Sequence, residues 1–199
     1  MTNTEKYEVF AVRYATRPAM RRDHFVGGDP HDDQMPMDYF VWLIRNNHRT
    51  FVVDTGFHAD MAKKRQRAYV RSPREGLALL GVDTHEVTDV ILTHLHYDHV
   101  GTFDDFPKAR FHLQDVEMSF ATGRHMCNGH YDEHMRSNRF FTLVFKLGDM
   151  LNGYRTLNEL AASPDHVVPG HDPLVMKYYP APSPELEGIV VRLDVAPKT

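Results

Sequence analysis

The chain has 199 residues, of which 42% are hydrophobic and 25% are charged, a composition typical of an ordinary soluble globular protein. This length predicts a single domain, residues 1–199, that can bury a substantial core. The formal net charge of −4 gives no electrostatic basis for binding nucleic acid or an anionic membrane, so neither is an expected partner.

Cysteine usage and the lack of long apolar runs indicate a cytoplasmic protein. Cys127 is the one cysteine, so it cannot form an intramolecular disulfide and fits a reducing compartment. The chain does not open with a signal-peptide pattern, and no apolar run is long enough to span a bilayer. The 14 histidines are the one compositional excess, and they favour a metal site because histidine is the commonest metal ligand among side chains.

The first half of the chain predicts a strand, a hairpin and a helical region. Residues 6–15 alternate as a strand does, and residues 38–56 are typical of a β-hairpin that leads into an Asp-Thr-Gly turn. Residues 58–80 have a helical pattern with a break at a Ser-Pro pair, and Gly81 is the expected C-cap. The basic run Lys63–Arg67 within this region predicts a solvated helix face.

The second half predicts strands that alternate with helices. The predicted strands are 88–93, 109–114, 139–146 and 166–170. The predicted helices are 115–123, with Asp115 as its cap, and 149–162, with Asp149 as its N-cap. Residues 124–138 are polar and give no clear prediction. Alternation of strands and helices predicts a layered α/β domain.

The stretch ILTHLHYDHVG, residues 91–101, carries a concentration of titratable side chains directly after a predicted apolar strand. A spacing of two keeps His94 and His96 on one side of an extended backbone, and Asp98 and His99 follow where the chain turns. Imidazole and carboxylate groups suit zinc, manganese or iron, and this set can begin two adjacent metal sites. The alternative is a group of surface histidines without a joint role, which four such residues in six positions make the weaker interpretation.

Residues 94–99, HLHYDH, match the H-x-H-x-D-H signature of the metallo-β-lactamase superfamily. The stretches VVDTG at Val52–Gly56 and VVPGHD at Val167–Asp172 are similar to two further turns of that family. The order of these motifs and their flanks resemble most the N-acyl-homoserine-lactone lactonase branch. The resemblance covers roughly residues 40–175.

The resemblance implies an αββα sandwich of the metallo-β-lactamase type with two divalent metal ions at one edge of its sheets. Zn²⁺ is the expected ion, with manganese or iron as alternatives. The implied ligands are His94 and His96 for the first ion, and Asp98, His99 and His171 for the second. A metal-bridging hydroxide would then attack the substrate carbonyl, and Asp98 would move a proton to the leaving alkoxide.

Asp54 and Tyr97 also lie within these motifs but are not among the implied ligands. Asp54 either holds the metal-binding loop through a ligand or caps the turn before Thr55–Gly56, and the sequence favours neither. Tyr97 is expected to fill space between the ligands.

The sequence also departs from the family pattern, which places one more histidine ligand and a bridging aspartate before the final Gly-His-Asp. Residues 139–146 lead directly into the next predicted helix, so part of the second sheet is missing at the 146/147 junction. Asp149 is a candidate for the bridging ligand, but a helix N-cap is favoured. Three loop histidines match the lost ligand only loosely: His125, His130 and His134.

Three explanations of this departure stay open. The natural protein has a segment that this sequence lacks, the chain was shortened on purpose, or the protein is a natural degenerate member of its family. The first is favoured because the flanking elements look intact, and because a half-sheet would leave the helix after the junction with little apolar surface to cover. A continuous chain would hold at most one metal well, on Asp98, His99 and His171.

The leading functional prediction is a dinuclear metallohydrolase that opens a lactone or similar cyclic ester, as in quorum quenching. A thioester hydrolase of the glyoxalase II type is the alternative within this class. A non-catalytic metal-binding protein is the alternative if the deletion is real. The expected partner is a small-molecule lactone or ester, and a homodimer stays open.

Overall fold

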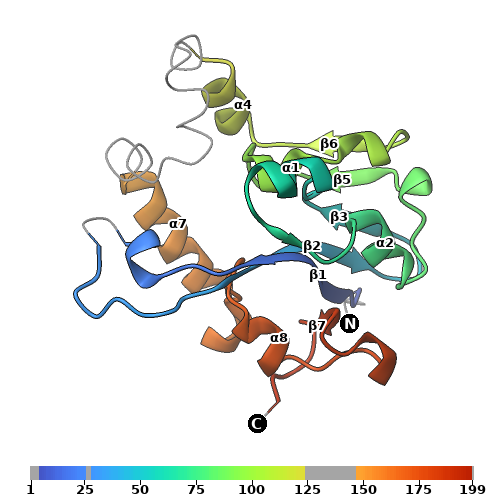
Figure 1. The fold of residues 1–199 in the computed structure, drawn as a ribbon. Helices are drawn as coiled ribbons and strands as arrows, with labels where there is room; N and C mark the ends of the chain where they lie inside the picture. Colours follow the sequence, from blue (N-terminus) through green and yellow to red (C-terminus); the bar gives the residue numbers. More distant parts are fainter. Residues whose placement is uncertain (1–4, 26–27, 124–146, 199) are drawn as a thin grey trace.

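A mixed β-sheet organises the structure, a computed structural model that describes residues 5–25, 28–123 and 147–198 (Figure 1). Its strands are β1 (Glu8–Arg17), β2 (Met37–Arg45), β3 (Thr50–Val53), β4 (Ala68–Tyr69), β5 (Asp89–Ile91), β6 (Arg110–His112) and β7 (Val190–Arg192). Their order is β4-β1-β2-β3-β5-β6, and β7 pairs with β1. Strands β1, β2 and β3 are antiparallel neighbours, whereas β3, β5 and β6 run parallel and therefore end at one common edge.

Helices cover both faces of this sheet. The helices in the described ranges are α1 (Ala59–Lys64), α2 (Pro73–Ala78), α3 (Tyr97–Val100), α4 (Asp115–Ala121), α7 (Leu147–Leu160) and α8 (Leu174–Tyr178). The short 3-10 turns are η1 (Arg21–Asp23), η2 (Thr84–Glu86), η3 (Phe103–Asp105), η5 (Pro164–His166) and η6 (Pro184–Leu186). Helices α1 and α2 pack on one face and α8 on the other (Figure 1). Within the described ranges, no helix is both long enough and apolar enough to cross a membrane.

The alternation of side chains along β2 divides the core into two layers. Tyr39, Val41 and Leu43 belong to the larger cluster, under α1 and α2. Phe40 and Trp42 point to the opposite face, where α8 and β7 pack. Full burial of one such side chain stabilises the fold by about 1.5–3 kcal/mol, so the larger cluster supplies most of the hydrophobic stabilisation of this sheet.

The layered α/β class predicted from the sequence is confirmed, as are the strands and the hairpin of the first 112 residues. All strands within the described ranges belong to the one sheet, so the second sheet of an αββα sandwich is not among them. Several predictions lie outside the described residues: Cys127, the strand 139–146, the loop histidines His125, His130 and His134, and the break at the 146/147 junction.

Some boundaries predicted from local patterns are wrong. The helix over 58–80 is two short helices separated by β4, because Gln66 has a φ of 56° and ends the first. No strand forms over 166–170, where η5 ends and an irregular turn follows. Helix α7 begins two residues before Asp149, and Asp115 is the first residue of α4, so neither is an N-cap.

The structure also differs from the sequence predictions in the basic run at the end of α1 and in the C-terminal part of the chain. The basic run Lys63–Arg67 is not uniformly solvated, because Arg65 and Arg67 are half-buried. Strand β7, which lies beyond the last predicted strand, pairs with β1.

Gly56 occupies the tightest turn beside the parallel strands, and its replacement tests how closely that turn is packed. Its φ is 76°, and an added Cβ would lie 2.6 Å from Cγ of Pro73 and 3.0 Å from Cζ of Tyr14. Gly81 has nearly the same φ, 75°, but nothing lies within 4 Å of an added Cβ.

We predict that Gly56→Ala lowers the free energy of unfolding by about 3 kcal/mol or more, since it combines backbone strain with overpacking. Gly81→Ala carries only the backbone strain and should cost about 1 kcal/mol. Chemical unfolding of both variants measures the difference. Equal costs would contradict a closely packed turn at Gly56.

Candidate metal centre

The two sequence motifs meet at the carboxyl edge of the parallel strands. Because β3 and β5 run parallel, Asp54 follows β3 at the same edge where the histidine-rich loop follows β5. The N–H of Asp54 donates to the carbonyl of Ile91, 2.8 Å away, and extends the pairing beyond both strands. The sheet therefore places the Asp-Thr-Gly turn against residues 94–99.

Hydrogen bonds to main-chain carbonyls hold helix α3 in place. The N–H and the hydroxyl of Thr55 both donate to the carbonyl of His99, at 2.7 and 3.1 Å. The buried hydroxyl of Tyr14 donates to the carbonyl of Asp98 at 2.9 Å. These bonds fix the backbone of α3, so the side chains of Asp98 and His99 have defined directions.

Asp98, His99 and His171 form a group whose ligand atoms all lie within 4.8 Å of one another. Oδ2 of Asp98 is 3.5 Å from Nε2 of His99 and 3.6 Å from Nε2 of His171. Two ligands of one tetrahedral zinc ion lie about 3.3 Å apart when the bonds are about 2.0–2.1 Å long. The two separations from Asp98 are therefore close to those of ligands that share an ion.

Asp54 orients His99 and controls its charge. Nδ1 of His99 donates to Oδ2 of Asp54 at 2.7 Å, and the Asp54 carboxylate is fully buried. Burial opposes protonation of His99, but the hydrogen bonds and charges of Asp54 and Asp98 outweigh it and raise the pKa of His99 to about 9. Without a metal, His99 is therefore an imidazolium between two carboxylates at neutral pH.

The backbone of Asp38 orients His171. Nδ1 of His171 donates to the carbonyl of Asp38 at 3.0 Å, and the N–H of Asp38 donates to the carbonyl of His171 at 3.0 Å. The Asp38 carboxylate pairs with Arg13 at 3.1 Å, which anchors this end of β2. Nε2 of His171 is thus left facing Asp98.

His94 and His96 lie beside this group but outside it. The ring centroid of His94 is 3.9 Å from that of His99, and Nε2 of His94 is 2.9 Å from Nδ1 of His96. The hydroxyl of Thr93 donates to Asp54 and accepts from Nδ1 of His94, so Nε2 of His94 accepts from His96. Burial and the neighbouring histidines lower the pKa of His94 to about 3, which keeps its ring neutral.

These side chains fit a divalent metal ion. Zinc, manganese and iron bind neutral imidazole and ionised carboxylate, and a ligating histidine normally donates its other N–H to a carboxylate or carbonyl. His99 and His171 both have this arrangement. Burial acts to raise the pKa of Asp98, but the hydrogen bond and charge of His99 and the charge of His171 hold it at about 2.

Of the five predicted ligands, the structure thus brings Asp98, His99 and His171 into one group and places His94 and His96 in contact with its edge. Asp54 contacts a predicted ligand directly, which the sequence had left open. Sequence reasoning missed three supporting residues: Tyr14, Asp38 and Thr93. Thr93 could have been found from its place between the strand and His94, whereas the other two contact the site only through the fold.

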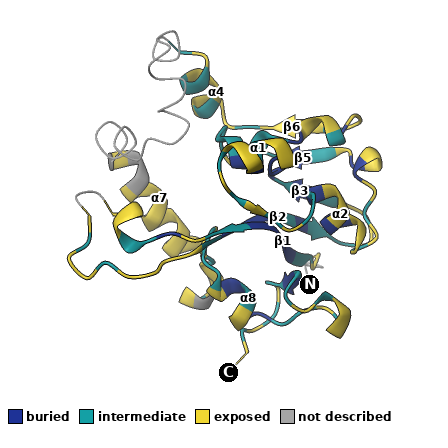
Figure 2. Ribbon diagram, viewed as in Figure 1, coloured by how far each residue is buried: buried dark blue, intermediate teal, exposed yellow. Residues whose placement is uncertain are grey.

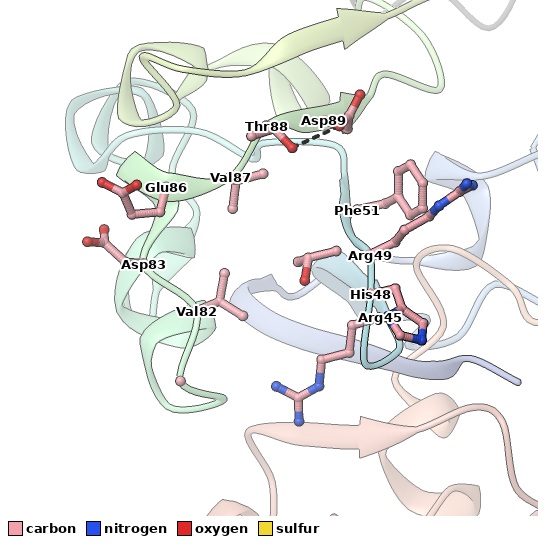
Figure 3. A pocket seen from close by; sticks show the side chains of 12 residues that line it. Arg45, His48, Arg49, Phe51, Val82, Asp83, Glu86, Val87, Thr88 and Asp89 are labelled. Atoms are coloured by element: carbon pink, nitrogen blue, oxygen red, sulfur yellow. Dashed lines mark hydrogen bonds between the residues drawn. The ribbon is translucent and has the colours of Figure 1, made fainter.

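A separate groove of about 680 Å³ lies at the opposite edge of the sheet (Figure 3). Arg45, His48 and Arg49 line it from the β2–β3 hairpin, and Asp83 and Glu86 line it from the segment around η2. This groove contains none of the predicted ligands, because the hairpin lies at the far end of β3 from Asp54.

The fold and the site together define a layered α/β protein with a candidate metal centre at the carboxyl edge of its parallel strands. The model of the metallo-β-lactamase superfamily matches residues 36–179, and the chain belongs to that superfamily. The family predicted from the H-x-H-x-D-H motif is therefore confirmed. No curated protein matches the chain.

Solved structures that resemble the chain do so at low identity. A quorum-quenching N-acyl homoserine lactone lactonase has 16% identity and a TM-score of 0.49, over 59% of this chain and 49% of that one. A probable metal-dependent hydrolase from Staphylococcus aureus has 14% identity and a TM-score of 0.49, over 60% and 51%. The dizinc quorum-quenching lactonase AidC has 17% identity and a TM-score of 0.46, over 76% and 56%. The chain thus spans about half the length of the solved structures that it matches.

The charge of His99 in the metal-free protein is directly measurable. We predict that His99 titrates near pH 9 and that His94 stays neutral above pH 5, because their pKa values are about 9 and about 3. The folded pKa of His99 exceeds the ordinary histidine value of about 6.5, so its protonation stabilises the fold below that pH. This stabilisation is lost as the pH rises through about 9.

NMR titration of the imidazole signals in chelator-treated protein checks this prediction. Asp54→Asn should move the midpoint of His99 down toward its ordinary value, whereas Asp89→Asn, which removes a carboxylate from the exposed His112, should not. A midpoint for His99 below 6.5 in the unchanged protein would contradict the prediction.

Proposed function

We propose that this chain is a metal-dependent hydrolase that opens a lactone or a similar cyclic ester. The observation that carries the proposal is the convergence of Nε2 of His99 and Nε2 of His171 on one oxygen of Asp98, with both rings fixed from behind. Membership of the metallo-β-lactamase superfamily supports it, because the matched residues 36–179 include all three of these side chains. The N-acyl-homoserine-lactone lactonase branch supplies the candidate substrate class.

The residues divide into ligands and supports. We propose that Asp98, His99 and His171 hold one ion and that His94 and His96 contribute to a second. Bound metal ions would lower the pKa of water and polarise the carbonyl of the substrate. Oδ2 of Asp98 faces both imidazoles, so we assign its other oxygen, Oδ1, to carry a proton to the leaving alkoxide.

A single-metal protein is the second candidate, and one observation favours it. His94 and His96 lie outside the group formed by the other three ligands, and they hydrogen bond to each other. A continuous chain that lacks the family's further histidine and bridging aspartate would hold one ion at Asp98, His99 and His171.

We propose that the natural protein is a single cytoplasmic domain with an additional segment at the 146/147 junction.

Mass and metal content together separate these candidates. Protein made from this continuous sequence has a mass of 23.0 kDa and should bind about one equivalent of zinc. A natural protein that carries the additional segment should be heavier than 23.0 kDa and bind about two equivalents.

Intact-mass spectrometry and elemental analysis measure both quantities. In the continuous chain, His171→Gln should abolish the bound zinc, whereas His96→Gln should retain it. Absence of metal after growth in metal-replete medium would remove the hydrolase proposal.

Substrate choice is tested with a panel of lactones, thioesters, phosphodiesters and β-lactams. We predict that the metal-loaded natural protein turns over homoserine lactones or an aromatic lactone fastest, since the net charge of −4 offers no steering toward strongly anionic phosphodiesters. Asp98→Asn should lower kcat by about 100-fold or more, because it removes a ligand charge and a proton carrier. A thioester that is hydrolysed far faster than every lactone would favour the glyoxalase II type.

A further inference from the structure

Three arginines gather around two tyrosines next to the candidate metal centre. Helix α1 ends at Lys64, and the left-handed backbone of Gln66 then turns the chain sharply between Arg65 and Arg67. Both arginines are consequently half-buried. Arg17 ends β1 beside this turn, because the preceding residue, Thr16, pairs with Ala68 of β4.

Both arginines of the turn between α1 and β4 contact Tyr97. The guanidinium carbon of Arg65 lies 3.8 Å from the centroid of the Tyr97 ring, and Nε of Arg67 donates to the Tyr97 hydroxyl at 3.3 Å. The other face of this ring stacks on Phe57, with centroids 5.6 Å apart. Tyr97 is therefore held rigidly, and it presents its hydroxyl to a positive charge rather than simply filling space.

Tyr39 lies beside both Tyr97 and Arg67. Its hydroxyl is 3.5 Å from that of Tyr97, and the guanidinium carbon of Arg67 is 6.0 Å from its ring centroid. Burial and the hydrogen bond to Tyr97 raise the pKa of Tyr39, and the positive charge of Arg67 acts against that rise. Arg17 itself donates to the sulfur of Met37 at 3.3 Å.

The same two tyrosines border the candidate metal ligands. The ring centroid of Tyr39 is 5.3 Å from that of His171. Tyr97 stands between His96 and Asp98 in the chain. The arginine cluster and the metal centre are thus separated by one layer of tyrosine side chains.

This cluster lacks the counter-charge that other arginines of the protein have. Arg13, Arg21 and Arg45 each pair with a carboxylate. Among the described residues, no carboxylate pairs with Arg65 or Arg67, whereas the positive charge of Arg17 helps to lower the pKa of Asp23. The Nε atoms of Arg17 and Arg65 are buried without a hydrogen-bond partner. A buried guanidinium nitrogen without a partner is costly, and a carboxylate is the group that a guanidinium fork matches best.

We propose that Arg65 and Arg67, with Arg17 beside them, form a subsite for a carboxylate, so that among otherwise matched esters and lactones the metal centre prefers those that carry one. The guanidinium forks supply charge-assisted hydrogen bonds, and the hydroxyls of Tyr39 and Tyr97 supply neutral donors beside them. The hydrolysis step of this inference rests on the proposed hydrolase function. The binding of a carboxylate rests on the arginine cluster alone.

A pair of esters that differ only in a terminal carboxylate tests the subsite. The metal-loaded protein is assayed with phenyl pentanoate and with the monophenyl ester of glutaric acid. We expect kcat/KM to be at least about tenfold higher for the carboxylate ester, mainly through a lower KM, as one charge-assisted contact provides. The preference should shrink toward unity in Arg67→Gln and Arg17→Gln, and Arg67→Lys should retain part of it.

Arg49→Gln is the matched control, because it removes the same charge from the groove at the opposite edge of the sheet (Figure 3). It should leave the preference intact. Equal kcat/KM values for the two esters in the unchanged protein, or an equal loss of preference in Arg49→Gln and Arg67→Gln, would overturn the subsite.

Binding of glutarate to metal-free protein, followed by calorimetry, keeps the subsite testable if neither ester is hydrolysed. If neither ester is hydrolysed, the hydrolase proposal is removed, and the binding of glutarate alone decides whether the anion site exists. Glutarate binding that weakens about tenfold or more in Arg67→Gln but not in Arg49→Gln would support the subsite. Equal affinity in all three proteins, or no binding to any, would overturn it.

Discussion

The carboxylate of Asp54 is the contact on which the arrangement of the site depends. It accepts from the N–H of Thr93 at 2.8 Å and from Nδ1 of His99 at 2.7 Å, and it is fully buried. One side chain thus joins the end of β3, the end of β5 and helix α3. Asp54 itself has a φ of 60°, a conformation that costs about 1–2 kcal/mol for a residue with a Cβ and that only a dense set of contacts maintains.

The charges of the site follow from that contact. Asp54 and Asp98 are two buried carboxylates on either side of one imidazole, and in the metal-free protein the proton on His99 balances part of their charge. A divalent ion on Nε2 would replace that proton and supply more positive charge in the same place. Metal binding and the protonation of His99 are therefore alternatives, and the fold is stable around either because a positive charge stands between the carboxylates in both.

Local patterns in the sequence were sufficient where the chemistry is local. The H-x-H-x-D-H motif, the strand before it and the Asp-Thr-Gly turn each lie within a few residues, and all are in the expected relation to the sheet. The support of His171 could not be predicted, because Asp38 precedes it by 133 residues and acts through its main chain. The burial of Arg65 and Arg67 was also unpredictable, since it depends on a left-handed Gln66 that no helical pattern signals.

The described part of the chain leaves one apolar face uncovered, and its position agrees with the departure from the family pattern. Leu151, Tyr154 and Leu157 recur at the spacing of one face of helix α7, yet they are 49%, 55% and 52% exposed (Figure 2). A helix with such a face normally packs on a sheet, which stabilises it more than its intrinsic propensity does. Helix α7 begins directly after the junction where the family's further histidine and bridging aspartate are lacking. The proposed additional segment at that junction would account for both the exposed helix face and the ligands that the family resemblance implies.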